Sequence, residues 1–282
     1  MRYVFKKMKN LSDEIRLAKA FCHANNCYGA ESYVNGFSGY SLELLVYHYR
    51  SFLKFIKAMK KQQDKIIIDI EKDYKNKQEI LMNLNSSKIQ SPIILIDPTY
   101  KHRNATAALS EEVFNRFTKA CKDFLKNPSK KMFQAEKINL EKIKDNAKIK
   151  KYEFILLEIK TGKQEGDIAG SKLLKFYNHL ACEISRFFDI KDKGFEYNEK
   201  KSARAFFAVK SKKEIIVGGP NANDKKNVDK FKKKHKKIFV KGKRVYSKKK
   251  IDFNIKKFVN NWKKNNKIKT SEMSVEGLEI IN

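Results

Sequence analysis

The sequence predicts an α+β fold in two parts, a mainly helical N-terminal domain and then a ferredoxin-like α/β domain with a basic C-terminal region. Three observations predict it. Apolar residues recur at helical spacing through much of residues 12–125, a strand, a helix and a strand follow one another between residues 151 and 210, and lysines concentrate after residue 225. We place the domains at residues 1–130 and 131–282. With 282 residues and 41% hydrophobic content, the chain can bury two cores.

Three helices are expected in the first domain. The first begins at Ser12, which two acidic residues follow, and ends near Asn25. The second is one long buried helix over residues 38–60, and the third covers residues 110–125. The apolar residues at helical spacing in the long helix are Leu42, Leu45, Val46, Tyr49, Leu53 and Ile56.

Two short apolar runs, residues 65–70 and 92–96, are typical of strands. The polar insertion between them, residues 72–91, is expected to be a mobile surface loop. Asp69 and Glu71 follow the three isoleucines of the first run, residues 66–68, but they have no Gly-Ser turn before them and no third carboxylate in a comparable setting. We interpret them as the end of a strand that meets solvent, and not as a metal site.

The second domain is expected to contain strands at residues 151–160 and 202–210, with a helix at residues 170–189 between them. A helical stretch follows at residues 228–235, with strands at residues 237–240 and 244–246. This order predicts a split βαβ, ferredoxin-like sheet.

The net charge indicates a polyanionic partner. Lys and Arg number 63 against 32 Asp and Glu, which gives a formal net charge of +31. This excess is most simply explained by nucleic acid, although a lysine-rich proteome would also raise the charge. Because most of the excess is lysine, which contacts phosphates as a point charge, little base specificity is expected from it.

The densest basic stretch alternates with apolar residues such as Phe231, Phe239 and Tyr246. That alternation predicts folded structure with one basic face, and not a disordered tail. We therefore expect a phosphate-binding surface there, with a merely solvated lysine face as the alternative. Its residues are Lys225, Lys226, Lys230, Lys233, Lys234, Lys237, Lys241, Lys243, Arg244 and Lys248.

The four cysteines, at positions 22, 27, 121 and 182, form no Cys-x-x-Cys pair and have no His-rich neighbour. Neither zinc nor a disulfide framework is indicated, and reduced core cysteines in a cytoplasmic protein are expected. No apolar run approaches the length of a signal peptide or a membrane span, so no membrane is expected among the partners.

Two segments together suggest a nucleotide site. Residues 28–40, read as YGAESYVNGFSGY, bring a tyrosine and a Gly-rich loop to the start of a helix. Residues 96–104, read as IDPTYKHRN, hold Arg103 just after a buried strand, on a Pro-stiffened turn. Lysine offers a point charge to a triphosphate, tyrosine a hydroxyl donor, and arginine a planar fork for base edges.

These two segments, with the residues that flank them, resemble the archaeal (class I) CCA-adding enzymes, the tRNA nucleotidyltransferases. The resemblance covers the central domain of that family, which is similar to the central domain of poly(A) polymerase and oligoadenylate synthetase, and its C-terminal body domain. It continues through Gly166-Asp167-Ile168, Phe206-Phe207 and Asn227-Val228-x-Lys230-Phe231. Beyond Trp262 no convincing match remains.

The resemblance implies roles for three residues. Lys19 and Tyr28 match positions that help to hold the incoming triphosphate, and Arg103 matches the arginine that reads the base edge of CTP or ATP together with the tRNA 3′ end. On sequence pattern alone, a solvated-face lysine, a packed tyrosine and a basic loop arginine are the alternatives. The basic stretch would bind the tRNA acceptor stem and TΨC arm by shape and phosphate position.

A member of that family begins with a catalytic head whose carboxylates hold Mg²⁺, and these 282 residues show no such segment. We expect the C-terminal subunit of a split CCA-adding enzyme that acts on tRNA lacking its 3′-CCA, with no catalytic or metal-binding residue of its own and no activity alone. A separately encoded head subunit would hold Mg²⁺, and the assembled enzyme could form a homodimer. A non-catalytic tRNA-binding protein with a relic pocket is the alternative, and a poly(A) polymerase or oligoadenylate-type relative is a third possibility.

Overall fold

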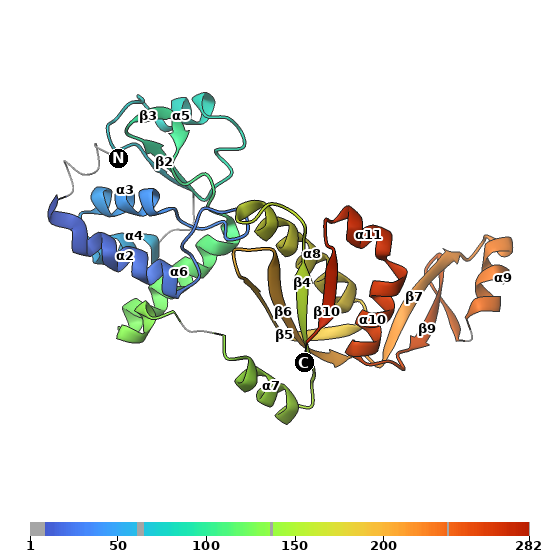
Figure 1. Ribbon diagram of the computed structural model, residues 1–282. Helices are drawn as coiled ribbons and strands as arrows, with labels where there is room; N and C mark the ends of the chain where they lie inside the picture. Colours follow the sequence, from blue (N-terminus) through green and yellow to red (C-terminus); the bar gives the residue numbers. More distant parts are fainter. Residues whose placement is uncertain (1–8, 61–64, 136–137, 236, 282) are drawn as a thin grey trace. The chain divides into compact units, whose positions relative to one another are not determined.

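The structure is a computed structural model that describes residues 9–60, 65–135, 138–235 and 237–281 (Figure 1). The chain divides into two compact units, Met1–Ile138 and Asn139–Asn282. Helices and strands are mixed in both units, which confirms the α+β class. No helix in the described ranges combines the length and the apolar character that crossing a bilayer requires.

The first unit is mainly helical, with a small sheet beside the helices (Figure 1). Its main core is dominated by fully buried aromatic rings, among them Phe21, Phe55 and Phe117. The ring centroids of Phe21 and Phe117 lie 6.1 Å apart in an edge-on arrangement, which is a favourable geometry for two aromatic side chains. The elements are η1 (Lys9–Leu11), α2 (Ser12–Ala24), α3 (Gly39–Tyr49), α4 (Phe52–Lys60), β1 (Ile66–Ile68), α5 (Lys77–Asn83), β2 (Ile93–Asp97), β3 (Tyr100–Asn104), α6 (Glu111–Lys126) and η2 (Lys130–Phe133).

The expectation of one long helix over residues 38–60 was wrong. The chain forms two helices, α3 and α4, because Arg50 adopts a left-handed conformation with φ of 66° and caps the end of α3. Glu14 in α2 then accepts a hydrogen bond from the backbone N–H of Phe52 at 2.6 Å, which satisfies the free start of α4. A cap supplied from a distant helix leaves no local signal in the sequence.

The insertion at residues 72–91 is also not simply a loop. It contains α5, whose preceding residue Asn76 accepts a hydrogen bond from the Glu79 N–H. Tyr74, Ile80 and Leu84 are buried in a second small core, together with Ile94 and Ile96 of β2. The few apolar residues of this polar insertion are therefore what hold it against the sheet.

The sheet of the first unit has the order β1-β2-β3. β1 runs parallel to β2, with Ile66 opposite Ile93, and β3 returns antiparallel with Asn104 opposite Ile96. Arg103 therefore lies on a strand, and not on a loop as expected. All five residues of β2 are buried, and Asp97 is the last of them.

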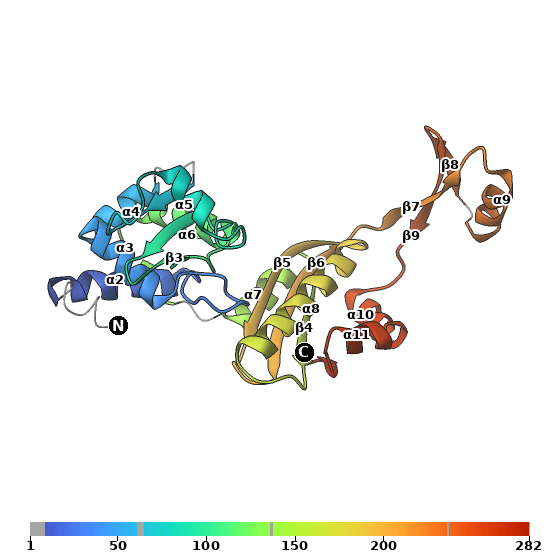
Figure 2. The ribbon, with the colours of Figure 1, turned by 90° about the horizontal axis from the view of Figure 1, so that it is seen from above.

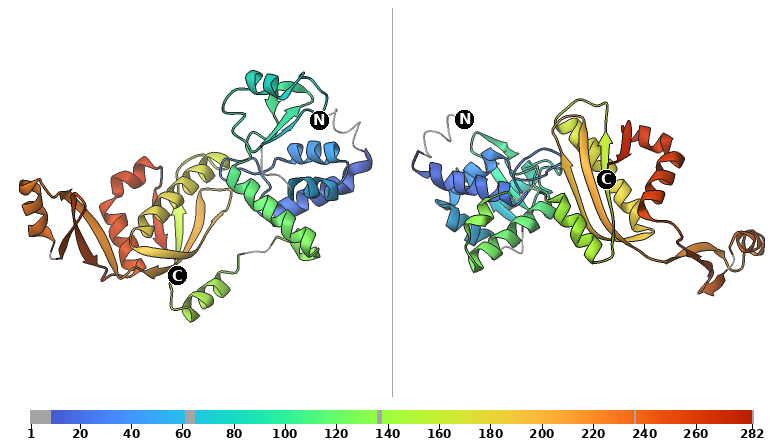
Figure 3. Two further views of the ribbon diagram at one scale, coloured as in Figure 1. Left: turned by 180° about the vertical axis from the view of Figure 1, so that it is seen from behind. Right: turned by 60° about the horizontal axis from the view of Figure 1, so that its bottom comes forward.

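The second unit confirms the ferredoxin-like prediction. Four strands are ordered β10-β4-β6-β5, and every adjacent pair is antiparallel. With α8 after β4 and two helices before β10, this is the βαββαβ order of a ferredoxin-like fold. Apolar residues of α8 and α10 pack with the sheet in one core (Figure 3). The elements are α7 (Leu140–Ile149), β4 (Glu153–Lys160), α8 (Asp167–Ser185), β5 (Phe188–Tyr197), β6 (Ser202–Ser211), α10 (Ile255–Asn265), α11 (Lys267–Glu272) and β10 (Gly277–Ile280).

Two details of that prediction were wrong. The helix expected to reach residue 189 ends at Ser185, and Phe188 already begins β5, a strand that the sequence did not indicate. The strands expected near residues 237–246 do not join the four-stranded sheet. They form a separate three-stranded sheet, β7-β9-β8, with the basic helix α9 inserted between β7 and β8 (Figure 2). Its elements are β7 (Glu214–Asn221), α9 (Lys225–Lys234), β8 (Ile238–Lys241) and β9 (Arg244–Lys250).

The cysteines are free thiols, and three of the four are buried as expected. Cys182 is exposed on α8, so the expectation of a core cysteine was wrong there. Burial is the main cause that raises the pKa of Cys27 to about 11, which keeps that thiol protonated.

Candidate nucleotide site and basic surface

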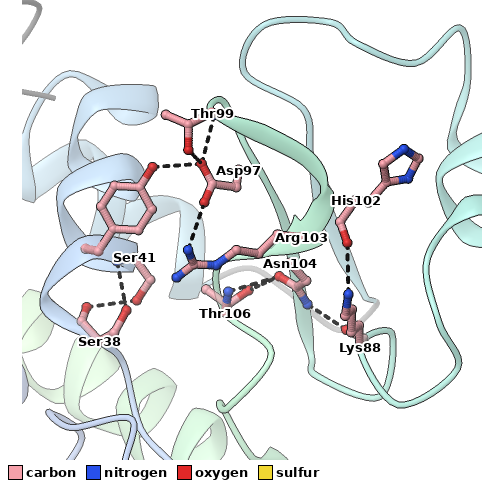
Figure 4. Close-up of polar contacts among 10 residues, drawn as sticks. Ser38, Ser41, Lys88, Asp97, Thr99, His102, Arg103, Asn104 and Thr106 are labelled. Atoms are coloured by element: carbon pink, nitrogen blue, oxygen red, sulfur yellow. Dashed lines mark hydrogen bonds and ion pairs between the residues drawn. The ribbon is translucent and has the colours of Figure 1, made fainter. Parts of the chain in front are cut away.

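The site is built around the start of α3. Ser38 caps this helix, since its hydroxyl oxygen accepts a hydrogen bond from the Ser41 N–H at 3.0 Å (Figure 4). The Ser41 hydroxyl donates in return to the Ser38 carbonyl oxygen at 2.9 Å. The helix therefore begins at Gly39, and the positive end of its dipole at this terminus favours anions.

The loop before α3 places Tyr28 against this helix start. Tyr28 and Phe37 form an isolated parallel bridge, and the Gly29 N–H donates to the Phe37 carbonyl oxygen at 2.8 Å. Gly36 is required for this close approach, because a Cβ there would lie 2.4 Å from the Cys27 carbonyl oxygen. The glycines of the 28–40 segment thus allow the loop conformation that directs the Tyr28 side chain toward the start of α3.

Lys19 and Tyr28 meet at Gly39. A Cβ added to Gly39 would lie 3.0 Å from the Tyr28 hydroxyl and 3.6 Å from Lys19 Nζ. The structure therefore brings these two predicted residues together at the N-terminus of α3. Lys19 Nζ also pairs with Glu43 Oε1 at 2.7 Å, which orients the ammonium group there. A lysine, a tyrosine hydroxyl and a helix N-terminus together suit a phosphate-bearing ligand.

Arg103 lies in a second cluster, which β2, β3 and the first turn of α3 form (Figure 4). Its Nη1 is 3.5 Å from Asp97 Oδ2, and its guanidinium carbon lies 5.7 Å from the centre of the Tyr40 ring. Tyr40 donates a 2.8 Å hydrogen bond to Asp97 Oδ1. Because Tyr40 directly follows Gly39, the helix start links the Lys19–Tyr28 group to the Arg103 cluster.

Tyr40 remains a neutral donor at ordinary pH. Burial, and then its hydrogen bond to the Asp97 carboxylate and the charge of that group, raise the pKa of Tyr40 to about 12. The phenol therefore keeps its proton and its contact with Asp97 across the physiological range. The ring beneath Arg103 carries no charge of its own.

Asn104 fixes the backbone from which Arg103 extends. Its side-chain oxygen accepts from the N–H groups of Leu95 and Thr106, and its amide nitrogen donates to the carbonyl oxygens of Lys88 and Ile93 (Figure 4). Only 3% of Asn104 is exposed. This single side chain therefore ties together β2, the end of β3 and the insertion before β2.

The sequence did not assign a role to Asp97, Tyr40 or Thr99, although all three lie within or beside the two singled-out segments. The available signal was a carboxylate directly after a fully apolar strand, at the Asp97-Pro98 step. A buried carboxylate in that position needs partners. Two of those partners are Thr99 and Arg103, which follow it closely in the sequence.

Asp69 has a structural role in this unit. Its Oδ2 accepts a 2.9 Å hydrogen bond from the backbone N–H of Tyr74, which folds the start of the insertion back toward β1. Within the described ranges, no group of three His, Cys, Asp or Glu side chains is arranged to hold a metal ion.

The predicted basic stretch forms α9, β8 and β9 (Figure 2). All ten of its predicted binding residues are exposed. Apolar side chains hold this surface together: Val228 and Val245 are buried, and the rings of Phe239 and Tyr246 stack with centroids 5.7 Å apart. The basic surface, defined as these ten residues, is therefore part of a folded module.

Comparison with known proteins identifies the relatives of this chain. The family described as tRNA nucleotidyltransferase, second domain, matches residues 13–134. The CCA-adding enzyme of Methanocaldococcus jannaschii is 31% identical over 240 residues, which is 82% of this chain and 52% of that enzyme. The CCA-adding enzymes of Nanoarchaeum equitans and Pyrococcus abyssi are 43% and 40% identical over 114 and 133 residues, which is 29% and 30% of their lengths. The resemblance to archaeal CCA-adding enzymes is confirmed, and the chain spans between 29% and 52% of these relatives.

Proposed function

We propose that this chain, a relative of the archaeal CCA-adding enzymes, binds tRNA and completes the nucleotide site of an enzyme that adds CCA to tRNA 3′ ends. The observation that carries the proposal is the meeting of Lys19 and Tyr28 at Gly39 of α3, the residue directly before Tyr40 of the Arg103 cluster. A triphosphate at this helix start would contact an ammonium group, a hydroxyl and backbone N–H groups. Arg103 would then face the base.

The chemical step is attack of the tRNA 3′ hydroxyl on the α-phosphate of CTP or ATP, with pyrophosphate leaving. The residues of this chain bind and orient the nucleotide in that step, and the basic surface holds the RNA by its phosphates. When bound, Mg²⁺ would offset the negative charge of the triphosphate and make the 3′ hydroxyl a better nucleophile. We assign the carboxylates that would bind it to a head subunit on a separate chain. The described residues themselves hold no group of three His, Cys, Asp or Glu side chains arranged for a metal ion.

Reconstitution tests the proposal. Labelled CTP and ATP are offered to tRNA that lacks its CCA end, with this chain alone, with a candidate head alone and with both together. Incorporation only in the combined reaction supports a split enzyme with a shared site. Incorporation by this chain alone would overturn the assignment of the metal site to a partner.

A second candidate is a non-catalytic tRNA-binding protein with a relic pocket. The exposed, folded basic surface favours it as strongly as it favours the enzyme, since phosphate binding needs no nucleotide site. Salt-sensitive tRNA binding without incorporation in any mixture would select this candidate. Binding of CTP or ATP to the chain would argue against it.

We expect Gly39→Ala to weaken nucleotide binding while the fold is retained. Alanine is a good helix former, but its methyl group would lie 3.0 Å from the Tyr28 hydroxyl, in the space assigned to the triphosphate. Affinity for CTP should fall about tenfold, because a small displacement at a phosphate site is costly. Calorimetric titration of the assembled enzyme measures it, and thermal unfolding checks the fold.

Gly218→Ala is the matched control for that change. Gly218 lies on β7, and the nearest atom to an added Cβ is a Tyr246 ring carbon at 4.0 Å. The control should leave nucleotide affinity unchanged. Equal weakening by both substitutions would mean that the effect does not come from the helix start.

We expect Arg103→Ala to impair nucleotide choice more than tRNA affinity. The arginine would hydrogen-bond base edges, so its loss should lower the preference for CTP and ATP over UTP and GTP by about tenfold or more. Affinity for tRNA should change by less than about twofold, since the phosphate contacts assigned to the basic surface are unchanged. Competition assays in the assembled enzyme measure the first quantity, and filter binding measures the second.

Arg16→Ala serves as the control, because Arg16 is an exposed arginine whose ion pair is with Asp13 in the same helix. It should change neither quantity. An equal loss of tRNA binding in Arg103→Ala would remove Arg103 from the base-reading role.

A further inference from the structure

We propose that Asp97 is a positioning residue that holds the Arg103 guanidinium ready for the nucleotide base, an assignment that rests on the function proposed above. The two partners are unequal in burial: the Asp97 side chain is 1% exposed, and the Arg103 side chain is 57% exposed. The carboxylate is therefore fixed by the fold. The arginine is the member that could otherwise move.

The two carboxylate oxygens of Asp97 have different surroundings. Oδ1 accepts hydrogen bonds from the Thr99 N–H at 2.9 Å, the Thr99 hydroxyl at 2.7 Å and the Tyr40 hydroxyl at 2.8 Å. Oδ2 is buried and accepts no hydrogen bond from any described residue, but Arg103 Nη1 lies 3.5 Å away. A buried carboxylate oxygen without a donor is costly. Among the residues that the structure describes, Arg103 supplies the cation that lies within 4 Å of this oxygen.

The contacts hold only part of the guanidinium. Asp97 faces Nη1, and the Tyr40 ring lies 5.7 Å from the guanidinium carbon. Arginine has five N–H donors, so most of them remain free on an exposed group to pair with a base edge. Holding the side chain in advance lowers the entropy that is lost when the base binds.

The structural and positioning roles of Asp97 can be separated. Oδ1 serves the local structure, and an asparagine oxygen could accept the same three hydrogen bonds. Oδ2 serves Arg103, and an asparagine would present an NH₂ group there, which cannot attract a guanidinium. Asp97→Asn therefore removes the hold on Arg103 while it retains the acceptor for Tyr40 and Thr99.

The first readout needs neither substrate nor partner. The Nε–H resonance of Arg103 is observed by ¹⁵N NMR in the full chain and is assigned by its loss in Arg103→Lys. In Asp97→Asn, the order parameter of this N–H bond should fall below about 0.6, since the contact that restrains the guanidinium through Nη1 is gone. Thr99→Val is the matched control: it removes one hydrogen bond to Oδ1 and keeps the charge, so it should lower the melting temperature without releasing Arg103. An unchanged order parameter in Asp97→Asn would overturn the positioning role, whatever the enzyme does.

The second readout is nucleotide choice in the assembled enzyme. The preference of Asp97→Asn for CTP and ATP over UTP and GTP should fall about tenfold, with kcat for the correct nucleotide less affected than KM. Thr99→Val should keep the wild-type preference. If Arg103 is released but the preference is unchanged, the role in base reading is wrong. If Arg103 is released and the wild-type assembly adds no nucleotide, the proposed function fails while the structural hold on Arg103 stands.

Discussion

Asn104→Ala should destabilise the first unit by about 3 to 5 kcal/mol, because it leaves several buried backbone groups without partners at once. The side chain accepts from the N–H groups of Leu95 and Thr106 and donates to two carbonyl oxygens, and all of these contacts are buried or partly buried. No water is expected to replace them in full, since only 3% of the residue is exposed. A loss of this size is a large part of the stability of an ordinary domain, which is about 5 to 15 kcal/mol.

Urea unfolding followed by circular dichroism measures the effect. The single tryptophan, Trp262, lies in the core of the second unit, so its fluorescence follows that unit separately. Asn83→Ala is the matched control, because Asn83 is exposed on α5 and its amide donates, among the described residues, to the Glu79 carbonyl oxygen alone. The control should cost less than about 0.5 kcal/mol. A similarly small cost for Asn104→Ala would show that the hydrogen bonds around it are replaced.

The sequence was sufficient where periodicity is local. Helices α2 and α6 begin close to the predicted caps, and β2 coincides with an uninterrupted apolar run. Prediction from the sequence failed where a residue distant in the chain determines the local conformation. The break between α3 and α4 depends on the left-handed Arg50 and on a cap from Glu14, 38 residues before Phe52. Strand β5 was missed because its apolar alternation is interrupted: Phe188 and Ile190 are separated from Phe195 and Tyr197 by a polar stretch, where the register also shifts.

The candidate site shows the same division. Lys19, Tyr28 and Arg103 were found through the resemblance, since their residue types alone are common on protein surfaces. The contact of Tyr40 with Asp97 joins residues 57 apart in the sequence, and only the fold brings them together. The orphaned Oδ2 atom of Asp97 is a property of packing. A single sequence does not show that one carboxylate oxygen lacks a hydrogen-bond donor. It shows only that a carboxylate follows an apolar strand.

The basic surface should dominate tRNA affinity, and removing part of it should have the largest effect on binding. Lys230, Lys233 and Lys234 lie on α9 and are exposed, and they form no ion pair with an acidic group in the described part of the chain. Changing all three to glutamine should weaken tRNA binding by about 10- to 100-fold near physiological salt, since each phosphate contact contributes through released counterions. Neutral glutamine keeps the length and helix propensity of the side chain, so α9 should persist.

The salt dependence of binding separates a surface that contacts phosphates from a general charge effect. Loss of three contacts should reduce the slope of log affinity against log salt by about 2 to 3, measured by filter binding at several salt concentrations. The matched control changes Lys119, Lys122 and Lys126, three exposed lysines of α6 in the first unit, to glutamine. Both triple variants lose the same charge, so an effect of net charge alone would lower affinity equally in the two. A lower slope confined to the α9 variant would establish that α9 contacts phosphates, and an unchanged slope there would return its lysines to the role of a solvated face.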